Sequence, residues 1–436
     1  MILGKLLVNT WIMSSRVFFL ILLAVFCGAG GGAFGQQIRT LEEFKTALLK
    51  NSPQVRVSQE SLGVSTRLKK SAFGALLPSL DLSSSLLADH TTDPEPLDAT
   101  GTSLKLSANF FNSQFDWFNY KISRFQERAS ELQYYTDVSA LVLNGIDLYL
   151  DYSDRYVALE TSRQRQQLIN EQYRISRRSY RSGTSTRLDF MRLQSEIKSS
   201  EFEVRRAETE YEKAENRLRA LFQNSSSELT FKPLVFDMSE SLPEIKESLP
   251  VEEHPEYQIE INRVKAAELE VKKAQRRYWP QISFGTELTE GLSGYWVEND
   301  RAHWGRDWVT TLTLTFNLFD GGQRSYDLAN QRSEVIIGES KAELARLKLD
   351  ADVKNLHIEG VRLKDQVKNA VEILRIDTQV FQSISHEYQV GNMGYLDFIN
   401  ALNQRLSSQL NLQTSISSYL KTYYNSLYYK GILVDE

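Results

Sequence analysis

The sequence predicts a membrane β-barrel continued by an all-α coiled-coil barrel, with four strands in each chain and an internal two-fold repeat. A motif, Tyr-x-x-Gly-x-x-x-x-Leu-Asp-Phe, occurs at residues 180–190 and again at 388–398. Each copy interrupts a long helix-like stretch without proline, and each stretch follows a pair of segments in which apolar and polar residues alternate. A duplicated unit of this kind indicates one elongated body and not a series of globular domains.

The composition argues against a nucleic-acid partner. The chain has 436 residues, 25% of them charged, and a formal net charge of -5. No basic stripe stands out that could neutralise phosphates. Loss of Lys5 and Arg16 with a signal peptide would change the net charge from -5 to -7.

Residues 1–35 are expected to be a secretory signal peptide. Basic residues accompany an apolar run at 17–26, and Ala33-Phe34-Gly35 fits a cleavage site. The single cysteine, Cys27, ends the apolar run, and its lipidation stays open, although Phe26 before it is larger than lipoprotein signals prefer. No other stretch reaches about 18 uncharged apolar residues, so no transmembrane helix is expected.

The β-hairpins are expected at residues 76–112 and 278–319. Leu104, Leu106, Ala108 and Phe110 alternate with polar residues, as do the leucines and threonines of 308–318. Each strand should have about ten residues, enough to cross a hydrocarbon core when tilted. Aromatic residues at the strand ends are expected to form interfacial girdles: Phe110, Phe111, Trp279, Trp308, Phe316 and Phe319.

Two structures could explain this alternation. A soluble sandwich also alternates, but two strand pairs some two hundred residues apart are too few to build one. In a membrane barrel the apolar face contacts lipid and the polar face lines a water-filled lumen. The smallest single-chain barrels use about eight strands, so further strands must come from other copies of the chain.

Long helical hairpins are expected at residues 113–223 and 320–430. An unbroken helix of roughly 68 residues would be about 100 Å long. Apolar and small residues recur with alternating spacings of four and three, as in Leu349, Val353, Leu356, Gly360 and Leu363. This period of 3.5 indicates helices packed as coiled coils, and the many small residues suit packing on both flanks around a cavity.

The remaining segments complete the predicted layout. N-terminal helices are expected at 36–75, an irregular equatorial linker at 224–256, a helix at 257–277 and a C-terminal tail at 431–436. All nine prolines lie outside the long helical runs, because proline cannot continue a helix.

The two hairpin tips carry the candidate functional residues. Gly183 and Gly391 suit positions with positive φ, and Asp189 and Asp397 fall in the first turn of the returning helix. Helix capping is a sufficient explanation for the two aspartates. If several chains meet around an axis, each aspartate also becomes a ring of carboxylates that selects cations or gates a tube. The two roles are compatible.

The sequence lacks the motifs of an enzyme. The five histidines show no metal-ligand spacing, and there is neither a nucleophile elbow nor a P-loop. A Gly-x-Gly-x-x-Gly match at residues 30–35 follows no strand and is a chance match. We therefore expect no catalytic residue, no cofactor and no metal.

On these residues the chain resembles the TolC family of outer-membrane efflux proteins. The carrying segments are Leu77-Pro78-Ser79, Trp279-Pro280-Gln281, residues 316–322 and both tip motifs. The resemblance implies a homotrimer in which three chains give four strands each to one twelve-stranded barrel, continued by a helical tunnel through the periplasm. It also implies a periplasmic adaptor and an inner-membrane transporter as partners.

The resemblance assigns roles to the tips. The adaptor would dock at the residues around the two turns, namely Gly183, Thr184, Leu188, Gly391, Asn392 and Leu396. The periplasmic end of the tunnel would be closed by inward-coiled helices. In the best-known members a second aspartate follows three residues after the first, but Asn400 and Arg192 stand at those positions here. A single ring at Asp397 is therefore expected.

The predicted function is an exit duct in the outer membrane of a Gram-negative envelope, a passive conduit driven by an inner-membrane transporter. The alternative is a trimeric structural or adhesive protein with a barrel anchor, a coiled-coil stalk and no through-flow. A soluble periplasmic coiled coil is the third hypothesis.

Overall fold

The structure is a computed structural model that describes residues 37–38, 40–88, 98–112, 114–182, 186–222, 230–236, 242–245, 251–298, 301–390 and 392–429. The predicted signal peptide, Cys27 and the C-terminal tail lie outside these residues.

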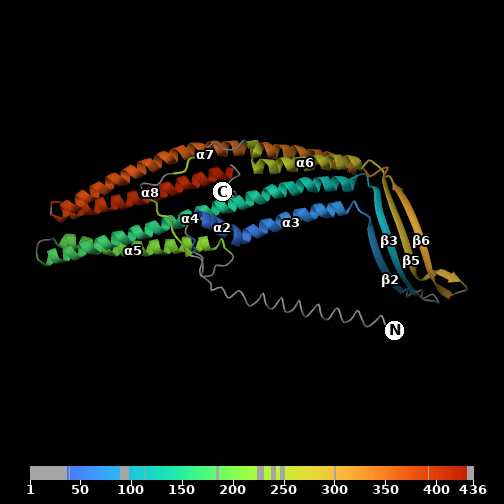
Figure 1. Cartoon of the computed structure of the whole chain (residues 1–436), viewed down its shortest axis with the longest axis horizontal. Helices are drawn as coiled ribbons and strands as arrows, with labels where there is room; N and C mark the ends of the chain where they lie inside the picture. The colour runs from blue at the N-terminus through green and yellow to red at the C-terminus, as the bar shows by residue number, and fades with distance from the viewer. Residues whose placement is uncertain are drawn as a thin grey trace, which may run out of the picture.

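The chain is strongly elongated, with a β-sheet at one end and helical hairpin tips at the other (Figure 1). Two 67-residue helices, α4 and α7, span almost the whole helical part, and shorter helices pair with each half of them. The elements are β1 (Gln37–Ile38), α2 (Leu41–Asn51), α3 (Pro53–Gly74), β2 (Ser79–Ala88), β3 (Asp98–Asn112), α4 (Phe115–Arg181), α5 (Arg187–Arg219), β4 (Thr230–Phe231), η1 (Val251–Glu253), α6 (Pro255–Arg276), β5 (Gln281–Glu298), β6 (Arg301–Thr315), α7 (Gln323–Gln389) and α8 (Tyr395–Tyr429).

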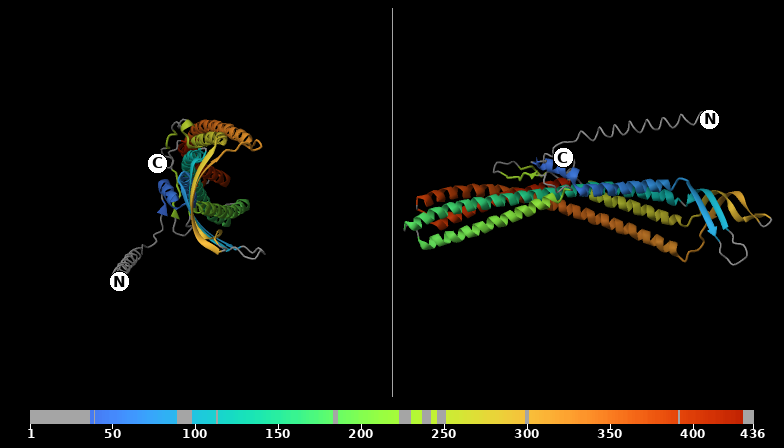
Figure 2. Two further views of the ribbon diagram at one scale, coloured as in Figure 1. Left: turned by 90° about the vertical axis from the view of Figure 1, so that its right-hand side faces the viewer. Right: turned by 90° about the horizontal axis from the view of Figure 1, so that it is seen from below.

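The sheet joins the two repeats. Its strand order is β2-β3-β5-β6 and every pairing is antiparallel, so the first hairpin pairs with the second through β3 and β5. The helices behind it form a curved layer, and the view along the long axis shows an open, C-shaped cross-section (left panel of Figure 2). Within the single chain, β2 and β6 are edge strands without a second neighbour.

Three strands are longer than the expected ten residues: β3 has 15, β5 has 18 and β6 has 15. Backbone pairing needs no apolar side chains, so the ladder continues past the apolar part of the strands. There the outward-facing Glu290 and Arg306 form an ion pair at 3.0 Å. No helix among the described residues is long and apolar enough to cross a membrane.

The predicted heptads are confirmed in the buried seams of the helices. In α7, buried residues include Leu349, Gly360, Leu363, Val367, Ala370 and Leu374, which are members of the predicted series. At Gly360 an added Cβ would lie 2.6 Å from Ile245 Cδ1, so a larger residue there would displace the Ile245 side chain of the linker segment 242–245. The same holds for Gly145 in α4, where a Cβ would lie 2.7 Å from Leu48 Cδ2 of α2.

Part of the segment between the repeats is held to the helices by side-chain hydrogen bonds. β4 pairs in parallel with β1, and Phe231 packs in a core with Phe44, Tyr149 and Tyr152. The Tyr152 hydroxyl donates to the Phe231 carbonyl at 3.0 Å, and the Phe236 amide donates to Gln413 Oε1 at 3.2 Å. The polar Gln413 in the α8 heptad series therefore serves the linker backbone.

Positive φ angles occur where strands lead into the long helices. Gln114 before α4 has φ 63 and Gly322 before α7 has φ 87, and these residues are equivalent in the two repeats. Among the described residues only Gly321 joins them with positive φ. Gly183 and Gly391, where we expected this conformation, lie outside the described residues.

Candidate functional site

The two faces of the sheet differ in chemistry, as the alternation predicted. On one face, Leu82, Leu104, Leu288 and Trp308 lie side by side across the four strands. Their neighbours along the strands include Leu80, Leu106, Phe284, Leu312 and Leu314. Leu82 and Leu312 are 73% and 70% exposed, so no other described segment of the chain covers these leucines of the apolar face.

The opposite face is polar and carries a row of charges. Asp81, Lys105 and Glu287 are direct cross-strand neighbours, and Val309 of β6 completes their row. Asp307, two residues earlier in β6, lies on the same face. Adjacent rows are built of hydroxyl residues, and Ser79 and Ser107 share a hydrogen bond of 2.7 Å. The described part of this face thus has three acids and one base, which favours cations near it.

The predicted aromatic girdle is only partly at strand ends. Trp279 directly precedes Pro280 and β5, while Phe316 and Phe319 follow β6, and all three are exposed. Trp308 was expected at a strand end, and this prediction is wrong. It lies in the middle of β6, because this strand begins at Arg301 and pairs with β5 beyond Trp308 on both sides. The side chains of Phe110 and Phe111 lie outside the described residues.

Each hairpin tip is closed by an aromatic clamp. The Phe398 ring stacks on Tyr388 with centroids 5.0 Å apart and contacts Phe381 at 5.8 Å. In the first repeat, Phe190 stacks on Tyr180 at 5.2 Å and on Tyr173 at 5.5 Å. Two aromatic residues seven positions apart on the outgoing helix therefore hold the phenylalanine of the Leu-Asp-Phe motif.

Sequence reasoning missed these clamps because it assigned the tip motif to the turn alone. The signal was present: Tyr173 and Phe381 are also equivalent positions of the repeat. The second clamp is the more buried, since Phe398 is only 2% exposed and joins Ile169, Leu402 and Leu406 in a core.

Asp397 has the capping role that the sequence indicated. Its Oδ2 accepts a hydrogen bond of 3.3 Å from the amide of Gly394, the residue before α8. This is the reciprocal half of a capping box, and the negative charge also stabilises the helix N-terminus. Asn392 Nδ2 donates to Glu387 Oε2 at 2.8 Å and so braces the turn.

The other predicted tip residues divide into two groups. Leu188 and Leu396 are 57% and 52% exposed, and Asn400 is also exposed. Gly183, Thr184 and Gly391 lie outside the described residues, as does the side chain of Asp189. The single chain contains the capping contact of Asp397, whereas a carboxylate ring would require an assembly of several chains.

An ion-pair network joins α4 and α5, the two long helices of the first repeat, on the tip side of the molecule. Arg165 of α4 contacts Glu196 at 2.5 Å and also pairs with Glu203, both of α5. The hydroxyl of Tyr395 in α8 is buried near this network. Its burial raises the pKa of Tyr395, and the negative charge of Glu196 raises it further. The described residues contain no cluster of three or more His, Cys, Asp or Glu that could hold a metal ion.

Comparisons with known proteins identify this architecture. The model of a family described as outer membrane efflux protein matches residues 46–222 and 252–425. No curated protein sequence matches the chain significantly. The chain is similar to the CmeC outer membrane channel of Campylobacter jejuni, with a TM-score of 0.79 and 15% identity over 90% of this chain and 86% of that one.

Two further solved structures show the same fold. The outer membrane protein VceC of Vibrio cholerae has a TM-score of 0.74 and 14% identity, over 90% of this chain and 96% of that one. The open state of the MtrE outer membrane channel of Neisseria gonorrhoeae has a TM-score of 0.73 and 15% identity, over 90% and 88%. The predicted combination of strand pairs and long helical hairpins is confirmed.

Proposed function

Because the chain belongs to the outer membrane efflux protein family, we propose that it is the exit duct of a tripartite efflux or type I secretion system. In this role it is a passive conduit from the periplasm to the outside, driven by an inner-membrane transporter. The observation that carries the proposal is the sheet with one apolar face, one charged polar face and two unpaired edges.

The free edges support a closed ring of identical chains. β2 and β6 are opposite edges of the sheet, so β6 of one chain can pair with β2 of the next. Such head-to-tail contacts close into a ring when the rotation is right. Three copies would give twelve strands, above the minimum of about eight that a barrel needs. A homotrimer is therefore proposed.

The chemistry of the two sheet faces supports the orientation in the outer membrane. The exposed leucines would contact lipid, and the row of Asp81, Lys105 and Glu287 would face a water-filled lumen. The helical body would then extend into the periplasm and bring the hairpin tips far from the membrane.

The hairpin tips support docking of a periplasmic adaptor. Several large apolar side chains are exposed there although the clamps bury others: Leu188, Met191, Val390, Met393 and Leu396. Exposed apolar clusters rimmed by polar residues mark interaction sites. Gly183, Thr184, Gly391 and Asn392 would belong to the same docking surface. Asp397 would line the periplasmic gate. Asn400, three residues later, and Asp189, the equivalent of Asp397 in the first repeat, would line it as well.

Conductance of the purified protein in planar lipid bilayers tests the proposal. A duct should give stable steps of current, and particles in detergent should have the mass of three chains. The adhesive alternative, a barrel plugged by its own stalk, predicts no steady current from an inserted trimer. A monomer that dissolves without detergent would refute both and favour the soluble coiled coil.

A further inference from the structure

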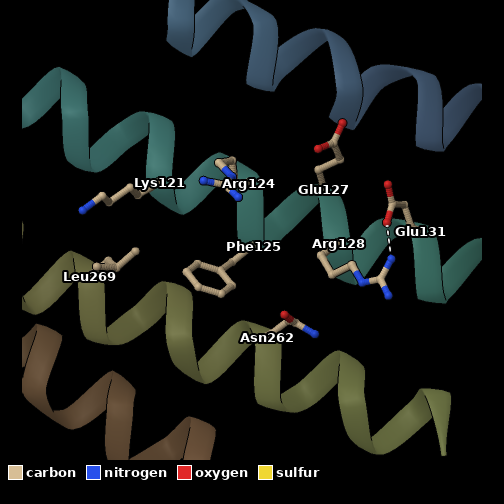
Figure 3. Close-up of a pocket in the computed structure, with 8 residues that line it drawn as sticks. All are labelled: Lys121, Arg124, Phe125, Glu127, Arg128, Glu131, Asn262 and Leu269. Carbon is tan, nitrogen blue, oxygen red and sulfur yellow. Dashed lines mark hydrogen bonds and ion pairs between the residues drawn. The ribbon is translucent and has the colours of Figure 1, made fainter.

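A pocket of about 550 Å³ lies between α4 and α6 (Figure 3), in the half of the helical body that adjoins the sheet (Figure 1). Phe125 and Leu269 give it an apolar floor, and Asn262 lies at its far end. Its rim is formed by charged residues of α4, namely Lys121, Arg124, Glu127, Arg128 and Glu131. An apolar floor under charged side chains suits an amphiphilic ligand.

The charges of this pocket do not cancel. Arg128 Nη1 is paired with Glu131 at 2.8 Å, and Glu127 is engaged by Lys69 of α3 at 2.5 Å. Neither Lys121 nor Arg124 has a carboxylate partner within the part of the chain that the structure describes. Two positive charges are thus left over, which indicates an anionic ligand.

The pocket opens on the outer side of the helical layer. Arg124, Arg128 and Glu131 precede Gly145, Tyr149 and Tyr152 by three heptads each, so they share a face of the supercoiled helix. That face of α4 is covered by α2 at the level of Gly145. α2 lies on the convex side of the C-shaped cross-section, away from the enclosed space (Figure 2).

The height of the pocket is close to the lipid-facing part of the sheet. Lys121 lies six residues after Phe115, the first residue of α4, which is roughly 9 Å along the axis. Side chains of a helix tilt toward its N-terminus, and for α4 this end meets the sheet. The side chains of Lys121 and Arg124 therefore lean toward the membrane.

Cations lie over exposed aromatic rings at the same level. Lys121 Nζ is 5.0 Å from the Trp117 ring, and the Arg276 guanidinium is 4.0 Å from the Trp279 ring. Arg324 is 4.9 Å from Tyr278. An aromatic residue at the membrane interface with a cation just beyond it matches the order of acyl chains and headgroups in a leaflet.

We propose that this pocket binds the headgroup of an anionic phospholipid of the periplasmic leaflet. The inference rests on the outer-membrane placement given under the proposed function. The phosphate lies between Lys121 and Arg124, and the glycerol and upper acyl chain lie on Phe125 and Leu269. The lipid would fix the height of the helical body below the membrane.

Native mass spectrometry of the full-length protein released from detergent tests the proposal with phosphatidylglycerol as the probe. The double substitution Lys121→Gln and Arg124→Gln should weaken phosphatidylglycerol binding about thirtyfold, since each cation near an anionic membrane surface contributes a factor of about five. Neutral phosphatidylcholine should bind weakly to both forms.

A matched control removes two positive charges from another pocket with the substitutions Arg155→Gln and Arg206→Gln. These two arginines line a pocket of about 500 Å³ between α4 and α5, far from the sheet. This control should keep wild-type lipid binding. Undiminished phosphatidylglycerol binding in the first variant, or equal binding of phosphatidylcholine, would overturn the proposal. Displacement of the lipid by millimolar inorganic phosphate would show a free-phosphate site instead.

The same samples separate this inference from the proposed function. Both double variants should conduct like wild type in planar bilayers, because neither touches the polar face of the sheet. Wild type without conductance would refute the duct. Normal conductance with unchanged lipid binding in the first variant would refute the lipid site alone.

Discussion

Phe398→Ala should loosen the second hairpin tip more than Phe190→Ala loosens the first. Phe398 is 2% exposed and lies between Tyr388 and Phe381 in a core that includes Ile169 of α4. Truncation of a buried phenylalanine costs about 3–5 kcal/mol. Phe190 is only half-buried, so less apolar surface and a smaller cavity are at stake there.

Hydrogen exchange of peptides from each tip measures this difference. A loss of about 3 kcal/mol in the opening free energy lowers amide protection roughly a hundredfold, up to the full protection of the segment. The peptides covering residues 381–405 should show this change in Phe398→Ala. Those covering 173–197 should change less in Phe190→Ala.

The comparison has a clear contrary outcome. If both variants lose protection equally, burial in the core around Ile169 adds nothing to the clamp. If Phe398→Ala keeps wild-type protection, the ring stack does not hold the tip. Phe398→Leu is a useful third variant, because it keeps most of the apolar volume and should retain intermediate protection.

Three further predictions concern other parts of the chain. Gln114→Gly should raise the unfolding temperature in detergent and Gly322→Ala should lower it, because both sites have positive φ and a non-glycine residue there costs about 1–2 kcal/mol; changes of the same sign would refute this. Burial lowers the pKa of His254 below its usual 6.5, against a smaller opposing effect of Glu256. When the pH falls, His254 is therefore protonated at a higher pH in the locally opened state than in the folded state, and protonation favours opening. Amide protection of residues 251–259 should fall as the pH drops below 6.5. His254→Asn keeps an N-cap acceptor and should remove this pH dependence, and persistence of the effect would exclude His254 as its source. Lys105→Glu should increase cation preference, read as a larger reversal potential in a salt gradient, because it turns a row of two acids and one base into three acids; an unchanged potential would place Lys105 away from the conduction path.

The repeat, the strand faces and the helical seams could be predicted from the sequence because each is a local periodic pattern. Alternation along 104–108 fixes which side chains share a face of β3, whereas a register shift after Ala108 places Phe111, and not the expected Phe110, opposite Ile282. The spacing of 349–374 fixes which residues of α7 are buried. The family match confirms the resemblance that was based on the tip motifs and the segments at the strand ends. Glycine at 183 and 391 marked the turns, since the helices end and begin on either side of them.

Other features depend on pairs of residues far apart in the chain. The pairing of β3 with β5, which places Lys105 beside Glu287, could not be read from either strand alone. The strand lengths also differed from expectation, because backbone ladders continue where side-chain alternation fades. Gln413 is a polar interruption in the sequence, and only the fold shows that it forms hydrogen bonds with linker residues 177 and 179 positions away.

By itself the sequence determined the kinds of element, their faces and their order, because propensity and periodicity act over a few residues. Only the tertiary structure decided which elements meet. It brought Lys121 and Arg124 next to Leu269, and it placed Gln413 of α8 against the Phe236 amide of the linker. Such contacts depend on the three-dimensional path of the chain, which a one-dimensional pattern does not contain.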